Sequence, residues 1–389
     1  MHATTVLQKL LAPALGSLDR RNAANLLSAV DACLRGRRLV LMELARHWRD
    51  AVKVWPPLKR LDRLLSNRSV QGQRVRFYQR VALLAVRSPE PVIVVDWSEL
   101  KADGRWQLLR AGLVVRGRTL TVYEEVHPQR LLNSPAVHRR FLTALRQVLP
   151  PTGRPIIVTD AGFRVPWFRQ VEALGWHWLG RVRGKVSPSR ADKAFSPFLS
   201  VADWYCQATP KATALGPIRL TLNHQLHAHG VLIRQPSKGR HQMLSRSRRR
   251  ADSGQARKMV RAAGEPWLLV CSPSLAERSG RQIVSLYSRR MQIESSFRDL
   301  KSHRFGAGFE DTQTRTAGRL QMLLLIHLLA TLVAWLAALA TAHRHEARFR
   351  VSMLRRGWEH LRRFGGRIPA PDQALSRLRT LADAAVAAT

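Results

Sequence analysis

The stretch Tyr287-Ser-Arg-Arg-Met-Gln-Ile-Glu-Ser-Ser-Phe-Arg-Asp-Leu-Lys301 combines an apolar stripe with a group of charged side chains. With about 100° between successive helical residues, its distinctive polar residues fall within about 60° on one predicted helix. These residues are Tyr287, Arg290, Glu294 and Lys301. The apolar stripe beside them is formed by Leu286, Ile293, Phe297 and Leu300. The pattern predicts a helix that is anchored to a core and presents one carboxylate among three phosphate-binding side chains. A solvated helix with mixed surface charge would show the same spacing.

Two further acids each end a short β-branched run. Asp96 closes the run that begins at Pro91, and Asp160 closes the run that begins at Pro155. Such runs are typical of buried strands, where a carboxylate is costly unless a partner neutralises it. The two strand-end acids therefore suggest that they share a cation.

The ordered acids Asp96, Asp160 and Glu294, with the pattern Tyr-x2-Arg-x3-Glu-x6-Lys, resemble the DDE cut-and-paste transposases of bacterial insertion sequences. The resemblance is to the insertion sequence four family, and it extends less specifically over most of the chain. It implies that the three acids are catalytic and hold two Mg²⁺ ions, with Mn²⁺ able to substitute. Carboxylate oxygens suit Mg²⁺, and an ion pair can activate the attacking oxygen and stabilise the leaving oxygen.

The resemblance also gives roles to the side chains around the acids. It implies that Tyr287, Arg290 and Lys301 hold the DNA end near the cleavage site, as substrate contacts rather than metal ligands. It places Trp267 where a tryptophan stacks on a base that has been flipped out of the duplex. A buried core tryptophan is the alternative for Trp267.

Composition supports a polyanionic partner. Lys and Arg total 65 against 26 Asp and Glu, a formal net charge of +39. Such self-repulsion favours binding to nucleic acid, although an anionic membrane surface or a ribosomal assembly would explain the charge equally well. The three cysteines form no Cys-x-x-Cys pair, which argues against a disulfide framework or a zinc site. We therefore expect a cytoplasmic, nucleoid-associated bacterial protein with no signal peptide.

Residues 322–342 contain no Lys, Arg, Asp or Glu and are long enough to cross a bilayer. Polar residues inside the segment and positive charge at both ends argue against a span. We expect a buried core helix and no membrane association.

The remaining patterning predicts an α/β protein. Helices are expected over 22–35, 39–48, 58–65 and 75–86, and the order β-β-β-α-β-α-β over 92–182 is that of a ribonuclease H-like core. We predict a helical DNA-binding domain over 1–86, a ribonuclease H-like catalytic domain over 87–345 with an inserted, mostly β subdomain over about 183–265, and a C-terminal helical region over 346–389.

The insertion carries a basic run in which Arg248, Arg249 and Arg250 are expected to contact the DNA backbone. A flexible, solvated loop is the alternative for this run. Because two DNA ends must be brought together, we expect a homodimer on double-stranded DNA, by analogy only.

The residues by themselves predict metal-dependent phosphoryl transfer on DNA. The resemblance implies a transposase that binds the inverted-repeat ends of its own element, cleaves them through a hairpin and joins them to target DNA. Two other classes fit the residues. One is a nuclease or resolvase of the same fold that cuts without joining, and the other is a non-catalytic basic DNA-binding protein.

Overall fold

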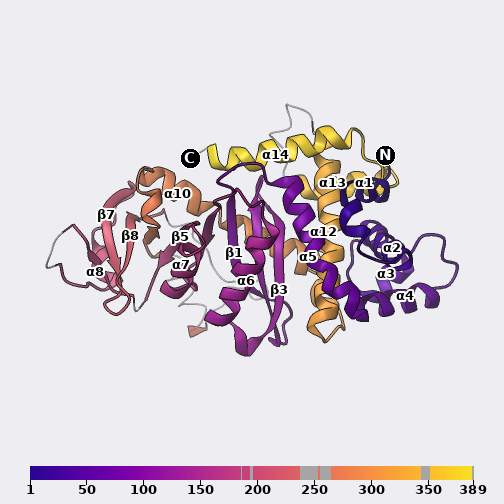
Figure 1. The fold of residues 1–389 in the computed structure, drawn as a ribbon, viewed down its shortest axis with the longest axis horizontal. Coiled ribbons are helices and arrows are strands. Elements are labelled where there is room, and N and C mark those ends of the chain that lie inside the picture. The colour runs from indigo at the N-terminus through magenta and orange to yellow at the C-terminus, as the bar shows by residue number, and fades with distance from the viewer. Residues whose placement is uncertain (185, 193–195, 237–252, 255–263, 343–350, 388–389) are drawn as a thin grey trace. The chain divides into compact units, whose positions relative to one another are not determined.

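The computed structural model shows a mixed α/β protein that divides into two compact units (Figure 1). It describes residues 1–184, 186–192, 196–236, 253–254, 264–342 and 351–387. The first unit contains Met1–Ile156 and Arg289–Ala388, and the second contains Ile157–Ser288.

The first unit begins with helices and continues into an antiparallel sheet. The helices are α1 (Ala3–Leu15), α2 (Arg20–Gly36), α3 (Leu41–Arg46), α4 (Trp55–Ser66) and α5 (Arg68–Ala85). The elements that follow are β1 (Val92–Glu99), β2 (Trp106–Val114), β3 (Thr119–Pro128), η1 (Gln129–Leu131) and α6 (Pro135–Val148). Side-chain caps fix two helix starts, because Asp19 accepts from the Asn22 amide at 2.8 Å and Asn67 accepts from the Val70 amide at 3.2 Å.

The C-terminal part of the chain completes the first unit. It contributes α11 (Met291–Lys301), η3 (Phe309–Asp311), α12 (Ala317–Ala340), α13 (Met353–Arg363) and α14 (Pro371–Ala387). Strand β2 lies between β1 and β3, with Asp96 opposite Arg110 and Arg110 opposite Glu124. The amide of Ile156, at the start of β4, donates to the Pro91 carbonyl at 3.0 Å, so the chain returns beside the start of β1.

Helix α12 is the core of the first unit. It is long and apolar enough to cross a membrane by length and composition, yet the apolar window of this helix is entirely buried in the structure. Figure 1 shows it beside β3 and the N-terminal helices, and it packs against α2, α5, α13, α14 and β3. A Cβ atom at Gly357 of α13 would overlap the carbonyl oxygen of Ala334, so only glycine permits this close helix crossing. The burial matches the expected core helix.

The second unit is built on a sheet in which β9 lies between β5 and β8, although β9 follows both of them in the sequence. Its strands follow the order β4-β5-β9-β8-β7-β6. These are β4 (Ile156–Thr159), β5 (His177–Val182), β6 (Pro188–Arg190), β7 (Thr213–Leu220), β8 (Leu226–Ile233) and β9 (Trp267–Cys271). The other elements are α7 (Val165–Glu172), α8 (Val201–Cys206), η2 (Pro273–Leu275) and α10 (Gly280–Ser288).

The element order along residues 92–182 is the predicted β-β-β-α-β-α-β. The predicted N-terminal helices are also present, but α1 precedes the first one that the sequence indicated. A large sheet with helices therefore confirms the mixed α/β class.

Candidate active site

Asp96 lies near the end of β1 and is 8% exposed. Its Oδ1 accepts from the Trp97 amide at 2.9 Å, and its Oδ2 accepts from Arg290 Nη1 at 3.2 Å. The run of valine and isoleucine that forms β1 carries this carboxylate into a largely apolar setting. The arginine supplies the positive charge that such a buried acid requires.

Glu294 lies in the first turn of α11, and its side chain is 45% exposed. Its Oε1 accepts from Arg290 Nη2 at 2.5 Å. One guanidinium therefore binds the carboxylates of both Asp96 and Glu294. The structure thus brings two of the three predicted acids to a shared cationic partner.

The orientation of α11 is fixed by contacts with the β2–β3 hairpin. The Thr119 amide donates to Ser296 Oγ at 3.0 Å, and Ser296 Oγ donates to the Thr119 carbonyl at 3.2 Å. Arg118 forms an ion pair with Asp299. These polar contacts hold the helix that carries Glu294 against the edge of the sheet.

The apolar stripe predicted from the sequence anchors the same helix. Ile293 and Leu300 are 0% exposed and Phe297 is 5% exposed. The guanidinium of Arg110 lies 5.2 Å from the centre of the Phe297 ring. Burial of this stripe leaves Glu294 on the accessible side of the helix.

Lys301 lies at the last residue of α11 and contacts the end of β1. Its Nζ donates to Ser98 Oγ at 3.1 Å and to the Glu99 carbonyl at 3.0 Å. Burial lowers the pKa of Lys301, while Glu310 and Glu99 act in the opposite direction. In the structure Lys301 therefore ties α11 to β1.

The single helix predicted over 287–301 is wrong, because α10 ends at Ser288 and α11 begins at Met291. The Ser288 hydroxyl donates to the Val284 carbonyl at 2.8 Å, a type of contact that often accompanies a bend in a helix. After it, the Gln292 amide bonds to the Arg289 carbonyl, three residues back. Tyr287 consequently belongs to α10 of the second unit, and the common helical face applies only to the residues from Arg290 onward.

Asp160 directly follows the buried strand β4 in the second unit. Its Oδ1 accepts from the Gly162 amide at 2.8 Å, which fixes the turn that leads toward α7. The strand-end position is the predicted one. Asp160 belongs to the second unit, whereas Asp96 and Glu294 belong to the first.

Trp267 and Tyr287 are neighbours within the second unit. Their ring centres are 5.1 Å apart with an interplanar angle of 71°, an edge-to-face arrangement. Tyr287 is only 5% exposed, whereas Trp267, the first residue of β9, is partly accessible. Two side chains expected to contact DNA thus support each other through ring packing.

A buried histidine lies behind the end of β1 and was not indicated by the sequence. Trp97 Nε1 donates to His138 Nε2 at 3.0 Å, and His138 is 5% exposed. Burial lowers the pKa of His138 to about 4, and nearby His127 lowers it further. The imidazole is neutral near pH 7, accepts from the indole and fixes Trp97 beside Asp96. Only its place on the apolar face of the helix over 134–148 could have indicated this role.

The other expected contacts are resolved only in part. Arg248, Arg249 and Arg250 lie outside the described residues. Within the described part of the chain, no group of three or more His, Cys, Asp or Glu side chains is arranged to hold a metal ion. Asp96 and Glu294 have a cation between them, but that cation is the Arg290 guanidinium.

The comparisons with known proteins place most of the chain in one family. A model described as "Transposase DDE domain" matches residues 87–333. No curated protein matches the chain. Among solved structures, the chain is similar to a piggyBac transposase in a cryo-EM synaptic complex with hairpin DNA, at 11% sequence identity and a TM-score of 0.37. That alignment covers 86% of this chain and 58% of the other, so the chain spans little more than half the length of that transposase.

Proposed function

Because the chain belongs to the transposase DDE domain family, we propose that it is a DNA transposase of the insertion sequence four type. In this proposal it binds the inverted-repeat ends of its element, cleaves them and joins them to target DNA. A ribonuclease H-like core would carry the catalytic acids. The proposal goes beyond the family match in its subfamily, its substrate ends and its reaction course.

One observation carries the proposal. Asp96 and Glu294 are 198 positions apart in the chain, yet they bind the two terminal nitrogens of the same guanidinium. Buried and half-buried carboxylates that share one cation form a site for positive charge, which phosphoryl transfer requires. The order of Asp96 and Glu294 and the spacing from Glu294 to Lys301 are those of the motif in the family that the sequence resembles.

The donor atoms fit divalent metal ions. Carboxylate oxygens are preferred by Mg²⁺, and the Arg290 guanidinium shows that Asp96 and Glu294 converge on a cation. Asp96, Glu294 and Asp160 would hold two Mg²⁺ or Mn²⁺ ions. When bound, such ions activate the attacking oxygen and neutralise charge on the phosphoryl group.

The side chains of this chain would position the DNA strand. Arg290 can grip a phosphate through two nitrogens once it leaves the carboxylates, and Lys301 adds a point charge nearby. Trp267 offers a partly accessible ring on which a base can stack, supported at its edge by Tyr287. The role of these four side chains is therefore to hold and bend the strand at the scissile phosphate.

The proposed reaction starts when water attacks the phosphodiester at the element's end and releases a strand with a 3′-hydroxyl. That hydroxyl attacks the opposite strand, which forms a hairpin and frees the flanking DNA. Hydrolysis of the hairpin restores the 3′-hydroxyl, and its attack on a target phosphodiester joins the element to new DNA. Each step exchanges one phosphorus–oxygen bond for another.

The wider DNA interface would use the excess positive charge of the chain. In the proposal the helical domain over 1–86 and the basic run with Arg248, Arg249 and Arg250 contact backbone phosphates of double-stranded DNA. A homodimer would bring the two ends together. Binding to the ends should weaken steeply as salt rises.

The test is cleavage of labelled element ends by the full chain in Mg²⁺ or Mn²⁺. Glu294→Gln keeps the side-chain shape but removes the charge, so cleavage should fall about a thousandfold or more while end binding is retained. The matched control is Glu277→Gln, which neutralises an exposed acid outside the motif and should cleave like the unmodified chain.

The products of the same assay separate the other function classes. Cleavage without joined products would point to a nuclease or resolvase. End binding without cleavage by the unmodified chain would point to a non-catalytic DNA-binding protein. Equal cleavage by Glu294→Gln and the unmodified chain would reject the assignment of the acid.

A further inference from the structure

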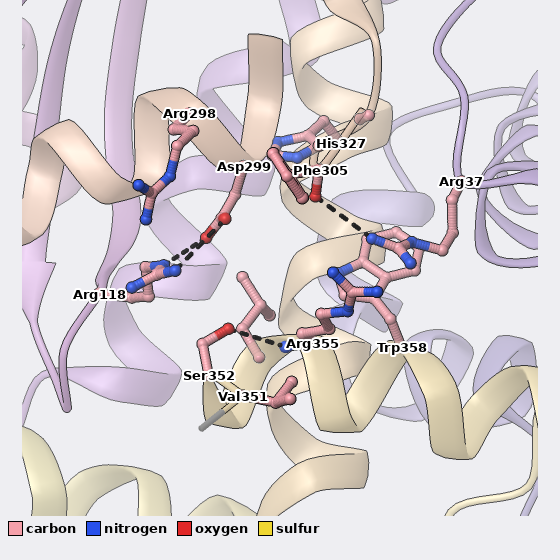
Figure 2. A pocket seen from close by; sticks show the side chains of 13 residues that line it. Arg37, Arg118, Arg298, Asp299, Phe305, His327, Val351, Ser352, Arg355 and Trp358 are labelled. Carbon is pink, nitrogen blue, oxygen red and sulfur yellow. Dashed lines mark hydrogen bonds and ion pairs between the residues drawn. The ribbon is translucent and has the colours of Figure 1, made fainter. Parts of the chain in front are cut away.

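A second candidate site lies in the first unit, away from the acids. An open cavity of about 320 Å³ is lined by α11, α12 and α13, together with the β2–β3 turn and the loops that follow α2 and α11 (Figure 2). Its charged lining consists of Arg37, Arg118, Arg298, Arg355 and Asp299. Asp299 follows Glu294 by five residues, about 140° around the helix, so the cavity faces a different direction from the acid pair.

The arginines of this cavity are only partly neutralised. Figure 2 shows Arg118 paired with Asp299, and Arg355 Nε donates to Glu359 at 2.9 Å. Among the residues that the structure describes, the Arg37 guanidinium donates only to the Phe305 carbonyl, from Nη2 at 3.4 Å. Within the described part of the chain, the guanidinium of Arg298 forms no hydrogen bond or ion pair. The lining therefore keeps an excess of positive charge.

The positively charged side chains of the cavity also repel one another. Burial lowers the pKa of Arg37, and the next contribution in the same direction comes from the charge of Arg355. A guanidinium stays protonated at neutral pH despite such a shift. An anion in the cavity would relieve the repulsion between Arg37 and Arg355.

Neutral donors complete an anion-binding lining. His327 of α12 is 7% exposed and lines the cavity, and its imidazole makes no hydrogen bond to the residues that the structure describes. Burial lowers the pKa of His327 to about 3, so the ring is neutral and can donate one N–H. Ser352 caps α13 by accepting from the Arg355 amide at 3.3 Å, and this helix start also lines the cavity. The partial positive charge of a helix N-terminus favours the same anionic ligand.

An aromatic ring stands beside these donors. Phe305 is 50% exposed and lines the same cavity, and Figure 2 places it next to Arg37. Exposed aromatic rings among cations are typical of sites that bind nucleotides, because bases stack on the ring while arginines bind phosphate. The cavity volume lies at the small end of the range for ligand sites and exceeds the needs of a bare phosphate ion.

We propose that this cavity binds one nucleotide unit, with its phosphate between Arg298, Arg355 and the start of α13 and its base against Phe305. The unit comes either from a free nucleotide or from a single DNA strand, since both present the same chemistry. The inference does not depend on the proposed catalysis, because none of the cavity residues belongs to the acid set.

The test measures binding of two probes to the full chain at fixed ionic strength. The probes are fluorescently labelled adenosine triphosphate and a labelled single-stranded oligonucleotide. The double variant Arg298→Ala/Arg355→Ala should weaken binding of at least one probe by tenfold or more, about the loss of one or two charge-assisted hydrogen bonds. Phe305→Ala should weaken the same probe, since it removes the stacking surface.

Non-specific attraction to a strongly basic protein is controlled by a matched charge change. The variant Arg139→Ala/Arg140→Ala removes the same charge from the exposed face of α6 and should change binding less than twofold. Specific loss for adenosine triphosphate identifies a free-nucleotide site, and specific loss for the oligonucleotide alone identifies a strand-binding site. Equal losses in the two double variants, or no saturable binding of either probe by the unmodified chain, would overturn the proposal. The catalytic proposal is tested separately, by end cleavage with Glu294→Gln.

Discussion

Two arginine–carboxylate clusters of the first unit differ in how completely they are enclosed. Arg110 and Glu124 pair across β2 and β3 at 2.7 Å, and each side chain is 1% exposed. Arg290 instead divides its nitrogens between Asp96 and Glu294, and the Glu294 side chain is 45% exposed. In the enclosed pair Glu124 also accepts from the buried Tyr78 hydroxyl, so both charges are held within the protein, whereas Glu294 of the open cluster is accessible to solvent. Enclosure thus separates a structural ion pair from a site that is available for chemistry.

The strongest test of this contrast is removal of one member of the enclosed pair. Glu124→Leu leaves the Arg110 charge buried without its partner and removes the acceptor of the Tyr78 hydroxyl, a bond of 3.0 Å. Breaking a buried pair in this way should lower the free energy of unfolding by about 3–5 kcal/mol. Urea unfolding followed by circular dichroism measures the change.

The double variant Arg110→Met/Glu124→Leu is the control for that measurement. It replaces both charges with apolar side chains and should recover most of the lost stability, because no unpaired charge remains. A single variant as stable as the unmodified chain would mean that Arg110 finds another partner, and the contrast between the two clusters would fail.

The second test concerns His138, the buried residue that fixes Trp97 beside the open cluster. The pKa of His138 is lowered to about 4 in the folded state, so protonation favours the unfolded state as pH falls below the ordinary value near 6.5. Stability attributable to His138 should therefore decrease on acidification, by about 2 kcal/mol between pH 7 and pH 5. The comparison is the pH profile of unfolding for His138→Gln and the unmodified chain.

Glutamine at this position can still accept from Trp97 Nε1 but does not titrate in this range. Between pH 7 and pH 5 the stability of this variant should therefore fall less than that of the unmodified chain. The difference between the two losses should be about 2 kcal/mol. Although burial opposes the shift, hydrogen bonds from His127 and Tyr123 lower the pKa of Glu125, so this carboxylate stays charged between pH 7 and pH 5 in both proteins. Parallel pH profiles for the two proteins would show that His138 is readily protonated in the folded state.

The residues of the two clusters also show what the sequence could predict. The element order over 92–182 and the buried stripe of Ile293, Phe297 and Leu300 follow from local patterns, which is why they were predicted correctly. The core helix of residues 322–342 follows from its unbroken apolar composition in the same way. These features depend on periodicity along the chain alone.

Two features of the candidate site were not indicated by the sequence. The predicted helix over 287–301 contains no Gly or Pro, so its composition did not indicate the break between Ser288 and Met291. The sequence did not indicate that Arg290 binds Asp96 and Glu294 or that Lys301 contacts the end of β1, because these contacts join residues far apart in the chain. The assignment of Arg290 and Lys301 to DNA phosphate stays a prediction. The domain division at residue 86, the β-rich insertion over about 183–265 and the basic contacts at Arg248–Arg250 stay predictions.

The subtlest test asks whether the guanidinium of Arg290 and a divalent cation compete for the same carboxylates. Arg290→Met keeps an apolar stem of similar length and removes the charge that binds Asp96 and Glu294. The two carboxylates would then lack their shared cation, so affinity for Mn²⁺ should rise about tenfold, roughly 1.4 kcal/mol. Titration of free Mn²⁺ by electron paramagnetic resonance measures this affinity without any DNA or turnover.

Two further variants are the controls for this measurement. Arg140→Met removes an equal charge from α6 and should leave the Mn²⁺ affinity unchanged, while Glu294→Gln added to Arg290→Met should cancel the gain. A lower affinity in Arg290→Met would instead mean that the arginine holds the carboxylates in the geometry that a cation needs, and the open cluster would then resemble the enclosed one more closely than its exposure indicates.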